Sequence, residues 1–252
     1  MGKTIFITGA SAGFGAACAK RFAQAGHKLI LMARRLPQLQ ELADSLEVPC
    51  HLIAADIREP KTLASEFEQL PSAFQDIDVL VNNAGLALDL SSADQADFAD
   101  WQIMIDTNVT ALAHCTHLIL PRMVAKHSGH VVNMGSIAGN DAYPGANVYG
   151  ATKAFVRQFS RNLRADMHGK GIRVTNIEPG LAETEFSLVR FKGDKNKANS
   201  VYEGTQPLTA ADVAEAVFWA TEQPSHVNIN TIELMPTCQS WGPLALHRGE
   251  KE

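Results

Sequence analysis

The sequence predicts a doubly wound α/β fold, in which helices cover both faces of a parallel seven-stranded sheet to give three layers, α/β/α. Seven short β-branched or aliphatic runs alternate with longer segments of helical periodicity, and a glycine-rich turn follows the first run. Strands that alternate with helices form parallel sheets with helices on both faces. The chain has 252 residues, 46% of them hydrophobic, which suits one sizeable core. We therefore expect a single domain over residues 1–252.

The seven apolar runs are taken as the strands, in chain order. They are TIFIT at 4–8, KLILMA at 28–33, CHLIAA at 50–55, DVLVNN at 78–83, HVVNMGS at 130–136, IRVTNIEP at 172–179 and TIELMP at 231–236. The first helix is expected over residues 14–25, with Gly26 as its C-terminal stop. The last helix is expected to begin at Thr209, because Asp212 three residues later completes a capping box.

Composition and charge argue against several classes of partner. The formal net charge is −5, which gives no general attraction to nucleic acid or to anionic membranes. The N-terminal apolar run is too short for a secretory signal and no later stretch approaches a membrane-spanning length, so we expect a cytoplasmic protein. The cysteines are scattered without a C-x-x-C pair, which predicts neither a metal site nor a disulfide framework. They are Cys18, Cys50, Cys115 and Cys238.

The glycine-rich turn TGASAGFG, residues 8–15, predicts a dinucleotide site. In open parallel sheets ligands bind beyond the carboxyl ends of the strands, and this turn joins the first strand to a helix. Gly9, Gly13 and Gly15 allow a tight turn that brings backbone N–H groups to a pyrophosphate at the helix N-terminus. Ser11 and Phe14 lie in the same turn and belong to the expected site. The placement predicts a Rossmann-type fold, although the spacing is G-x-x-x-G-x-G rather than G-x-G-x-x-G.

The cofactor is predicted to be NADP because a carboxylate typical of NAD sites is missing. NAD sites usually hold the ribose 2′-hydroxyl with an Asp or Glu about 20 residues past the glycines. Here the first acidic residue of the chain is Glu41, and the end of the second strand reads MARR. Arg34 and Arg35 are therefore available for bidentate hydrogen bonds to a 2′-phosphate.

Tyr149 and Lys153, in NVYGATKAFVRQ at 147–158, are the predicted catalytic pair. On a helix this spacing brings both side chains to one face. Oxidation of an alcohol requires a base, and a phenol with a pKa of about 10 is a poor base at neutral pH. We expect Lys153 and a positive nicotinamide ring to lower the pKa of Tyr149. Ser136, which ends a strand 13 residues before Tyr149, is expected to hydrogen-bond and orient the substrate oxygen.

Together these motifs resemble those of the short-chain dehydrogenase/reductase family over most of the chain. The motifs are TGASAGFG, NNAG at 82–85, Asn108 in IDTNV, Ser136, YGATK and PG at 179–180. Five longer stretches resemble the NADP-dependent 3-hydroxy acid dehydrogenases, also described as serine or allo-threonine dehydrogenases: NNAGLAL, NVYGATKAFVRQFS, EPG, TEFSLVRFKGD and HVNINTIELMP. The resemblance implies hydride transfer between NADP and a small 3-hydroxy acid such as L-serine, L-allo-threonine or 3-hydroxypropionate, with malonic semialdehyde as a corresponding carbonyl product.

The resemblance also implies roles for residues that spacing alone does not single out. Asn108 would hold a water that carries protons between Lys153 and solvent. Asp56 would contact the adenine, Asn83 the adenosine side of the site, and Thr184 the nicotinamide carboxamide. The cofactor site that it implies is completed by Ala84, Gly85, Pro179 and Gly180.

Residues 187–207 form a polar stretch, poor in strand residues, that we expect to leave the sheet as a substrate lid or as a plain surface loop. A 3-hydroxy acid carries a carboxylate that must be paired once it leaves water. Arg190 is the candidate partner and Lys192 is the alternative, while an ordinary surface arginine remains the simpler interpretation of Arg190.

The tail at 236–252 contains Trp241, Leu244 and Leu246 among turn residues. Burial against another subunit explains this composition, and the resemblance implies a homotetramer. A free tail is the alternative.

Other functions stay open from the sequence alone. One is an NADPH-dependent reductase of another small aldehyde or ketone, since substrate choice lies in the polar excursion. Another is a non-catalytic NADP-binding regulator, against which the intact Ser136, Tyr149 and Lys153 argue. A nucleic-acid or protein-binding module is disfavoured by the acidic charge balance.

Overall fold

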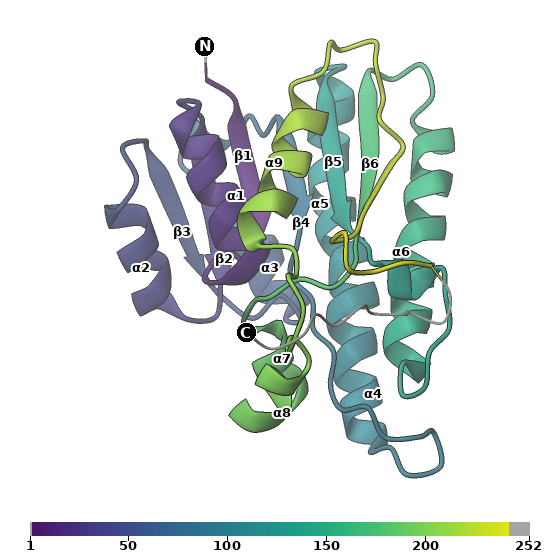
Figure 1. The fold of residues 1–252 in the computed structure, drawn as a ribbon. Helices are drawn as coiled ribbons and strands as arrows, with labels where there is room; N and C mark the ends of the chain where they lie inside the picture. Colours follow the sequence, from purple (N-terminus) through teal and green to yellow (C-terminus); the bar gives the residue numbers. More distant parts are fainter. Residues whose placement is uncertain (1, 242–252) are drawn as a thin grey trace.

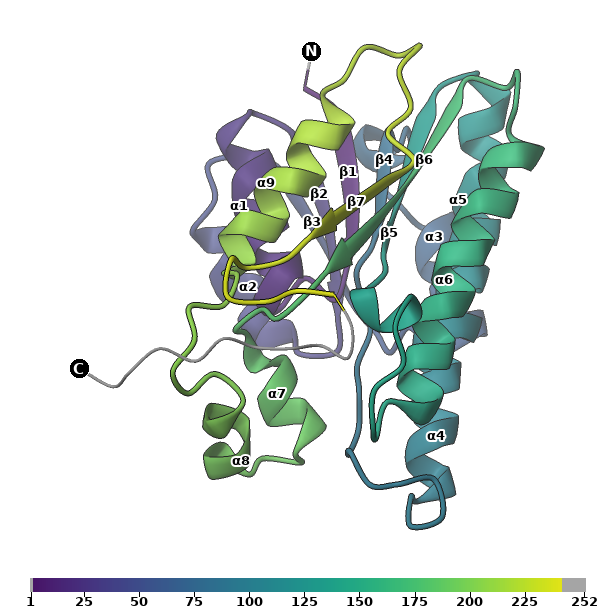
Figure 2. The same cartoon turned by 45° about the vertical axis from the view of Figure 1, so that its right-hand side comes forward.

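The computed structural model describes residues 2–241 and confirms the predicted architecture. Seven parallel strands form one sheet in the order β3-β2-β1-β4-β5-β6-β7 (Figure 1 and Figure 2). They are β1 (Thr4–Thr8), β2 (Lys28–Ala33), β3 (Cys50–Ala54), β4 (Val79–Asn82), β5 (Gly129–Met134), β6 (Ile172–Pro179) and β7 (Thr231–Leu234). The apolar runs of the sequence thus mark all seven strands, with ends that differ by at most two residues.

Successive side chains of each inner strand enter two different apolar cores, one on each face of the sheet. In β1, Ile5 and Ile7 belong to one core and Phe6 belongs to the other. β2 alternates in the same way. Because side chains in a strand alternate between the two faces, a strand covered on both faces needs apolar residues at every position. This requirement explains the continuous apolar runs.

Helices cover both faces of the sheet (Figure 1). The core around Ile5 is covered by α1 (Gly13–Gln24), α2 (Leu36–Asp44) and α9 (Ala210–Thr221). The core around Phe6 is covered by α3 (Pro60–Glu68), α5 (Leu112–Ala125) and α6 (Asn147–Asp166). Two predicted helix ends are confirmed. Gly26, just past the end of α1, has a φ of 76°. Thr209 and Asp212 form a complete capping box at the start of α9.

The expectation that no stretch approaches a membrane-spanning length is wrong for one helical run. α4 (Phe98–Ile105), the π-helical η2 (Asp106–Ala111) and α5 form 28 continuous helical residues that are long and apolar enough, by length and composition, to cross a membrane. The core helix of a soluble protein passes the same test. Here 44% of the most apolar window is buried inside the protein, and α5 packs against β4 and β5.

The polar stretch 187–207 is partly helical rather than a plain loop throughout. It includes the end of α7 (Glu185–Arg190) and the whole of α8 (Lys195–Ser200), and the two helices lie together beyond the carboxyl ends of the strands (Figure 2). Its two ends meet, because the N–H of Leu208 donates to the oxygen of Leu181 at 3.0 Å and the N–H of Glu183 donates to the oxygen of Leu208 at 2.9 Å. The excursion therefore leaves the sheet and returns to it at one place.

The start of the C-terminal tail lies against the last strand. The indole N–H of Trp241 donates to Glu233 Oε1 at 2.6 Å, although 67% of the Trp241 surface is exposed. Leu244 and Leu246 lie outside the described residues.

Candidate active site

A cleft runs along the carboxyl ends of the central strands β1 and β4. From β1 the chain continues to β2 on one side of the sheet, and from β4 it continues to β5 on the other side. Such a switch in strand order opens a crevice in doubly wound sheets. Two adjoining pockets make up the cleft: we call one the tyrosine pocket, beside Ser136, Tyr149 and Lys153, and the other the arginine pocket, beside Arg34 and Asp56. The residues that line both pockets are Gly9, Ser11, Arg35, Ala84, Gly85, Leu86, Glu185 and Val189.

The glycine-rich turn forms the wall between β1 and α1. Gly9 has a φ of 68°, and a Cβ atom on it would lie 2.9 Å from the Cα of Ala84. A Cβ atom on Gly15 would lie 2.3 Å from the oxygen of Gly9, so the chain approaches itself too closely for any side chain. Ala12 caps α1 without a side-chain hydrogen bond and the first turn carries no acidic residue, which leaves the first N–H groups of α1 available to an anion. Gly13 and Phe14 also line the tyrosine pocket.

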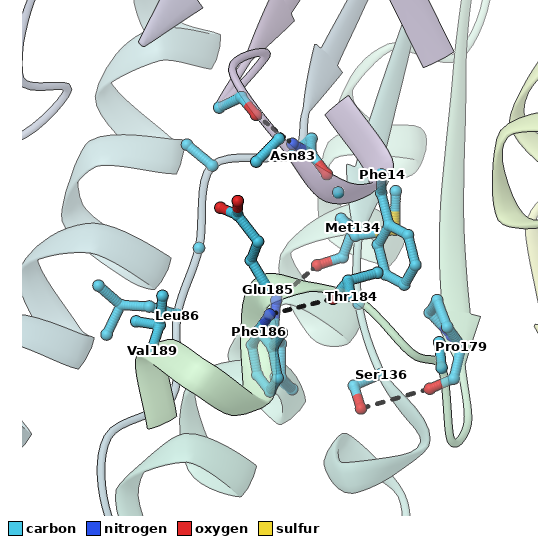
Figure 3. Close-up of a pocket in the computed structure, with 18 of the residues that line it drawn as sticks. Phe14, Asn83, Leu86, Met134, Ser136, Pro179, Thr184, Glu185, Phe186 and Val189 are labelled. Atoms are coloured by element: carbon cyan, nitrogen blue, oxygen red, sulfur yellow. Dashed lines mark hydrogen bonds between the residues drawn. The ribbon is translucent and has the colours of Figure 1, made fainter. Parts of the chain in front are cut away.

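Asn83 ties the glycine turn to the end of β4. Its side-chain amide donates to the oxygen of Thr8 at 2.9 Å and to the oxygen of Gly9 at 3.2 Å. Figure 3 shows Asn83 beside the glycine turn. The hydroxyl of Thr8 in turn accepts from the backbone N–H groups of Asn83 and Ala84, both at 3.0 Å. Asn83 lines the tyrosine pocket, and its amide hydrogen bonds brace the floor of the cleft.

The arginine pocket contains the two arginines that the sequence analysis singled out, together with a third. Arg34 lines this pocket and makes no hydrogen bond or ion pair within residues 2–241. Asp56, also in the pocket, is held by Arg58, whose guanidinium lies 2.6 Å from its carboxylate. Hydrogen bonds from Arg58 lower the pKa of the Asp56 carboxyl below its ordinary value. The sequence analysis did not find Arg58.

Arg35 has partners on both sides of the cleft. Its guanidinium donates to the hydroxyl of Ser11 in the glycine turn, at 3.2 and 3.4 Å, and to Glu185 Oε2 at 3.1 Å. Glu185 is the first residue of α7 and was not identified from the sequence. Figure 3 shows its side chain rising from α7 into the tyrosine pocket toward the loop of Asn83.

Tyr149 and Lys153 lie on one face of α6, as predicted, and both are buried. Lys153 Nζ donates to the main-chain oxygen of Met134, at the end of β5, at 2.8 Å. It lies 5.8 Å from the centroid of the Tyr149 ring. Burial lowers the pKa of Lys153 to about 8, because a charged ammonium loses its hydration in the interior.

The pKa of Tyr149 moves in the opposite direction to the sequence prediction. Burial raises it to about 12, with a further upward contribution from Tyr143. Arg190 and a hydrogen bond with Ser136 lower it, but by less than burial raises it. A phenolate is costly in an apolar environment, so in the protein alone Tyr149 is a neutral phenol at physiological pH.

Ser136 follows β5 and faces the tyrosine pocket. Its hydroxyl accepts from the N–H of Ala138 at 3.1 Å, which starts a short 3₁₀ turn (Ile137–Gly139). The same hydroxyl donates to the oxygen of Pro179 at 3.5 Å, a long contact drawn in Figure 3. Pro179 and the adjacent Gly180 line the pocket from the end of β6. The structure therefore brings Ser136 and Tyr149 together, as the spacing predicts.

Asn108 lies in the π-helical turn η2 rather than in a regular α-helix, and its side chain is buried. Its amide donates to the oxygen of Leu86 at 2.8 Å and to the hydroxyl of Thr152 at 3.0 Å, while its oxygen accepts from the N–H of Leu86 at 2.9 Å. A Cβ atom on Gly85 would lie 3.2 Å from Asn108 Oδ1 and 3.5 Å from Lys153 Nζ. Gly85 therefore approaches both of these polar atoms closely. Single-turn π-bulges are frequent at functional sites.

α7 and its N-cap Thr184 form another wall of the tyrosine pocket. Thr184 caps the helix by accepting from the N–H of Phe186 at 3.1 Å (Figure 3). Phe186 packs on Tyr149 with ring centroids 5.7 Å apart. The guanidinium carbon of Arg190 lies 4.9 Å from the centroid of the Phe186 ring and 5.5 Å from that of Tyr149.

The structure distinguishes the two cations proposed for a substrate carboxylate. Lys192 Nζ lies 2.7 Å from Asp100 Oδ2, so this cation already has a buried carboxylate as its partner. Arg190 has a buried Nε atom without a hydrogen-bond partner, and it forms no ion pair within the described part of the chain. Arg190 stands next to the pocket rather than among its lining residues.

Comparisons with known proteins agree with this geometry. Residues 3–194 match the family described as short chain dehydrogenase. The chain is 51% identical over 245 residues to the NADP-dependent 3-hydroxy acid dehydrogenase YdfG of Escherichia coli (strain K12), covering 97% of this chain and 99% of that protein. It is 49% identical over 251 residues to sulfoacetaldehyde reductase 2 of Chromohalobacter salexigens, covering 98% and 100%. Its structure superposes on the closed form of serine dehydrogenase complexed with NADP⁺ with a TM-score of 0.94, at 51% identity over 97% of this chain and 99% of that chain.

Proposed function

The chain belongs to the short-chain dehydrogenase family, and we propose that it transfers hydride between NADP and a small 3-hydroxy acid of the L-serine, L-allo-threonine or 3-hydroxypropionate type. The reverse reaction would reduce the corresponding carbonyl, such as malonic semialdehyde. The observation that carries the proposal is the position of Tyr149 and Lys153. Both side chains lie on one face of α6 in the pocket that also contains Ser136 and the glycine turn.

NADP is the cofactor, and when bound it accepts hydride in alcohol oxidation or, in its reduced form, donates it. The glycine turn fits its pyrophosphate, because the positions of Gly9 and Gly15 exclude side chains and the first N–H groups of α1 are free. Arg34 and Arg35 would pair with the 2′-phosphate. The further residues that we assign to the cofactor site are Ser11, Gly13, Phe14, Asp56, Asn83, Ala84, Gly85, Tyr149, Lys153, Pro179, Gly180 and Thr184.

Tyr149 would act as the acid and base at the substrate oxygen, and Ser136 would orient that oxygen by a hydrogen bond. The raised pKa keeps Tyr149 protonated, which suits donation of its proton to the alkoxide that forms during reduction. Oxidation requires the same phenol to lose its proton. Oxidation therefore depends on positive charge nearby, from Arg190 and from the oxidised nicotinamide.

Lys153 and Asn108 would carry the proton between Tyr149 and solvent. The pKa of about 8 allows Lys153 to exchange protons near neutral pH. Both N–H groups of the Asn108 amide are already bonded, so only its oxygen is left to receive a water. Asn108 Oδ1 and Lys153 Nζ both lie close to Gly85, and we propose that such a water would bridge them.

Arg190 would pair with the substrate carboxylate. Its unpartnered Nε is the main support, because a buried N–H group without an acceptor costs free energy that an anion recovers. The position beside Tyr149 would hold the carboxylate close to the reacting hydroxyl. Lys192 serves less well, since a substrate would first have to displace Asp100.

A second candidate is the reduction of another small aldehyde or ketone, including a sulfonated aldehyde. Its support is the 49% identity to sulfoacetaldehyde reductase 2 together with the protonated state of Tyr149. A sulfonate is also an anion that Arg190 would bind. A non-catalytic NADP-binding regulator is the third candidate, and the complete set of Ser136, Tyr149 and Lys153 argues against it.

The test is a substrate panel run with NADP and with NAD. We expect oxidation of L-serine, L-allo-threonine or 3-hydroxyisobutyrate with NADP⁺, and much slower oxidation of neutral secondary alcohols. Sulfoacetaldehyde and malonic semialdehyde with NADPH form the reduction arm. Faster turnover of neutral alcohols than of every hydroxy acid would reject the proposed substrate class, and NADP binding without turnover on the whole panel would favour the regulator.

For the whole protein we propose a single catalytic domain over residues 1–252, with 187–207 as a substrate lid and 236–252 as a C-terminal tail, assembled into a cytoplasmic homotetramer. Large apolar side chains on the surface support the assembly: Phe155 on α6 is 37% exposed and Trp219 on α9 is 51% exposed. A light-scattering mass of one chain in solution would reject the homotetramer.

A further inference from the structure

We infer that Glu185 is an internal occupant of the 2′-phosphate site, which bound NADP displaces from Arg35. The inference rests on the proposed function, because it takes Arg35 as a phosphate ligand. Three observations carry it: Arg35 is already paired, its partner comes from α7, and the pair stands where the two pockets join. Glu185 lies in the stretch TEFSLVRFKGD, but the sequence analysis gave it no role.

The pair occupies the edge of Arg35 that an anion would use. Arg35 Nη2 lies 3.1 Å from Glu185 Oε2, and the same nitrogen donates to the hydroxyl of Ser11 at 3.2 Å. Arg35 therefore faces the glycine turn, and a carboxylate already accepts from its guanidinium. A phosphate and a carboxylate recognise a guanidinium with the same planar hydrogen-bonding geometry. Arg34 has no such partner within residues 2–241.

The pair also spans the cleft. Arg35 follows β2, whereas Glu185 begins α7 after β6, and both side chains line the tyrosine pocket as well as the arginine pocket. A dinucleotide that reaches from the glycine turn to the arginine pocket must pass this pair. Its 2′-phosphate offers Arg35 a replacement acceptor with more negative charge than a carboxylate.

The segment anchored by Glu185 carries the substrate side of the site. In the turn and a half that follow it, Phe186 packs on Tyr149 and Arg190 lies over the same ring. Release of Glu185 by the cofactor would free the start of α7 from the end of β2. Binding of the adenosine half would thereby be linked to the position of α7.

The experiment measures binding of 2′,5′-ADP and of 5′-AMP, which differ by the 2′-phosphate and contain no nicotinamide. Titration calorimetry is applied to the wild type, Glu185→Gln, Arg35→Gln and the double variant. Both partners are largely exposed, and exposed ion pairs are worth up to about 1 kcal/mol, or about fivefold in affinity. We expect Glu185→Gln to tighten 2′,5′-ADP about two- to fivefold, to leave 5′-AMP unchanged, and to have no effect once Arg35 is Gln.

Glu183→Gln is the matched control. It removes the same charge two residues earlier, from a side chain that lines neither pocket. If both substitutions changed the affinity for 2′,5′-ADP equally, the cause would be the loss of a negative charge at long range. That result would overturn the inference. Weaker binding of 2′,5′-ADP to Glu185→Gln would also overturn it, because Glu185 would then position Arg35 for the phosphate rather than compete with it.

Trypsin cleavage within residues 190–197 provides a readout of α7 itself. Saturating 2′,5′-ADP should speed cleavage after Arg190 or Lys192 in the wild type. The Glu185→Gln variant should be cleaved at this faster rate even without 2′,5′-ADP. An unchanged rate in the wild type would remove the link to α7. A different result would contradict the proposed 2′-phosphate site itself. In that case the wild type would bind 2′,5′-ADP no better than 5′-AMP.

Discussion

The guanidinium of Arg190 lies over the ring of Tyr149, with its central carbon 5.5 Å from the ring centroid. Arg190 can therefore influence the proposed hydride transfer in two ways. Its charge lowers the pKa of the Tyr149 phenol, which burial raises, and its unpartnered Nε is free to take an acceptor from a substrate. The two consequences have different kinetic signatures.

Arg190→Gln should raise KM for a 3-hydroxy acid by roughly tenfold to a hundredfold, as expected for loss of a charge-assisted hydrogen bond. For a neutral alcohol KM should stay nearly constant. Steady-state kinetics on a matched pair of substrates measures both. Lys192→Gln is the control, because it removes a cation two residues later that already pairs with Asp100. Equal losses on both substrates in Arg190→Gln would exclude contact with the carboxylate.

Tyr149→Phe should lower kcat by on the order of 10²- to 10⁴-fold, since it removes the group that exchanges the proton with substrate. Binding of NADPH, followed by its fluorescence, should change little. Retention of more than a tenth of the wild-type kcat would transfer the acid–base role to another residue.

The rate of alcohol oxidation should rise with pH between about pH 7 and 9, whereas the rate of carbonyl reduction should not rise. The sign follows from the raised pKa of Tyr149, because oxidation needs the phenolate and reduction needs the phenol. Initial rates in both directions over this range provide the measurement. Parallel pH profiles would place the titrating proton elsewhere.

In the wild type we expect the free energy of unfolding to rise with pH, and Lys153→Met should remove this rise. In the fold the pKa of Lys153 is lowered from 10.5 to about 8, so between these values the unfolded chain holds a proton that the folded chain has lost. More protons on the unfolded chain mean that the free energy of unfolding rises with pH across this window, by roughly 3 kcal/mol in total. Urea unfolding of wild type and variant at pH values across the window measures the difference. Identical slopes would show that Lys153 is more hydrated than its burial indicates.

Arg34→Gln should weaken binding of NADPH by roughly tenfold to a hundredfold and leave binding of NADH nearly unchanged. The reason is that Arg34 lines the arginine pocket and makes no hydrogen bond or ion pair within residues 2–241. Arg161→Gln, an equal change of charge on the exposed surface of α6, should affect neither cofactor. Similar losses for NADPH and NADH would mean that Arg34 does not read the 2′-phosphate.

Local pattern was sufficient to predict the sheet and part of the site. Strands covered on both faces are mostly apolar, so their positions are visible as uninterrupted runs such as that of β2 from Leu29 to Ala33. The spacing of Tyr149 and Lys153 fixes a shared helical face, and the glycines of the first turn are required wherever the backbone approaches itself. Each of these features depends on neighbours within a few residues.

Features that depend on distant neighbours were not predicted. The ion pairs of Arg35 with Glu185 and of Lys192 with Asp100 join residues that are far apart in the sequence. The raised pKa of Tyr149 in the protein alone was not predicted, because desolvation depends on everything packed around the ring, including Phe186 from α7. Sequence spacing shows which charges are near a group, whereas it does not show how much water remains.

The excursion that contains α7 and α8 begins and ends at hydrogen bonds between Leu181, Glu183 and Leu208. Chain length between two such fixed points can vary at a small entropic cost, since loop closure depends only logarithmically on length. The proposed catalytic residues, Ser136 after β5 and Tyr149 and Lys153 on α6, lie outside this interval. Substrate preference can therefore diverge among homologues through exchange of one compact insert, while the hydride-transfer chemistry is inherited unchanged.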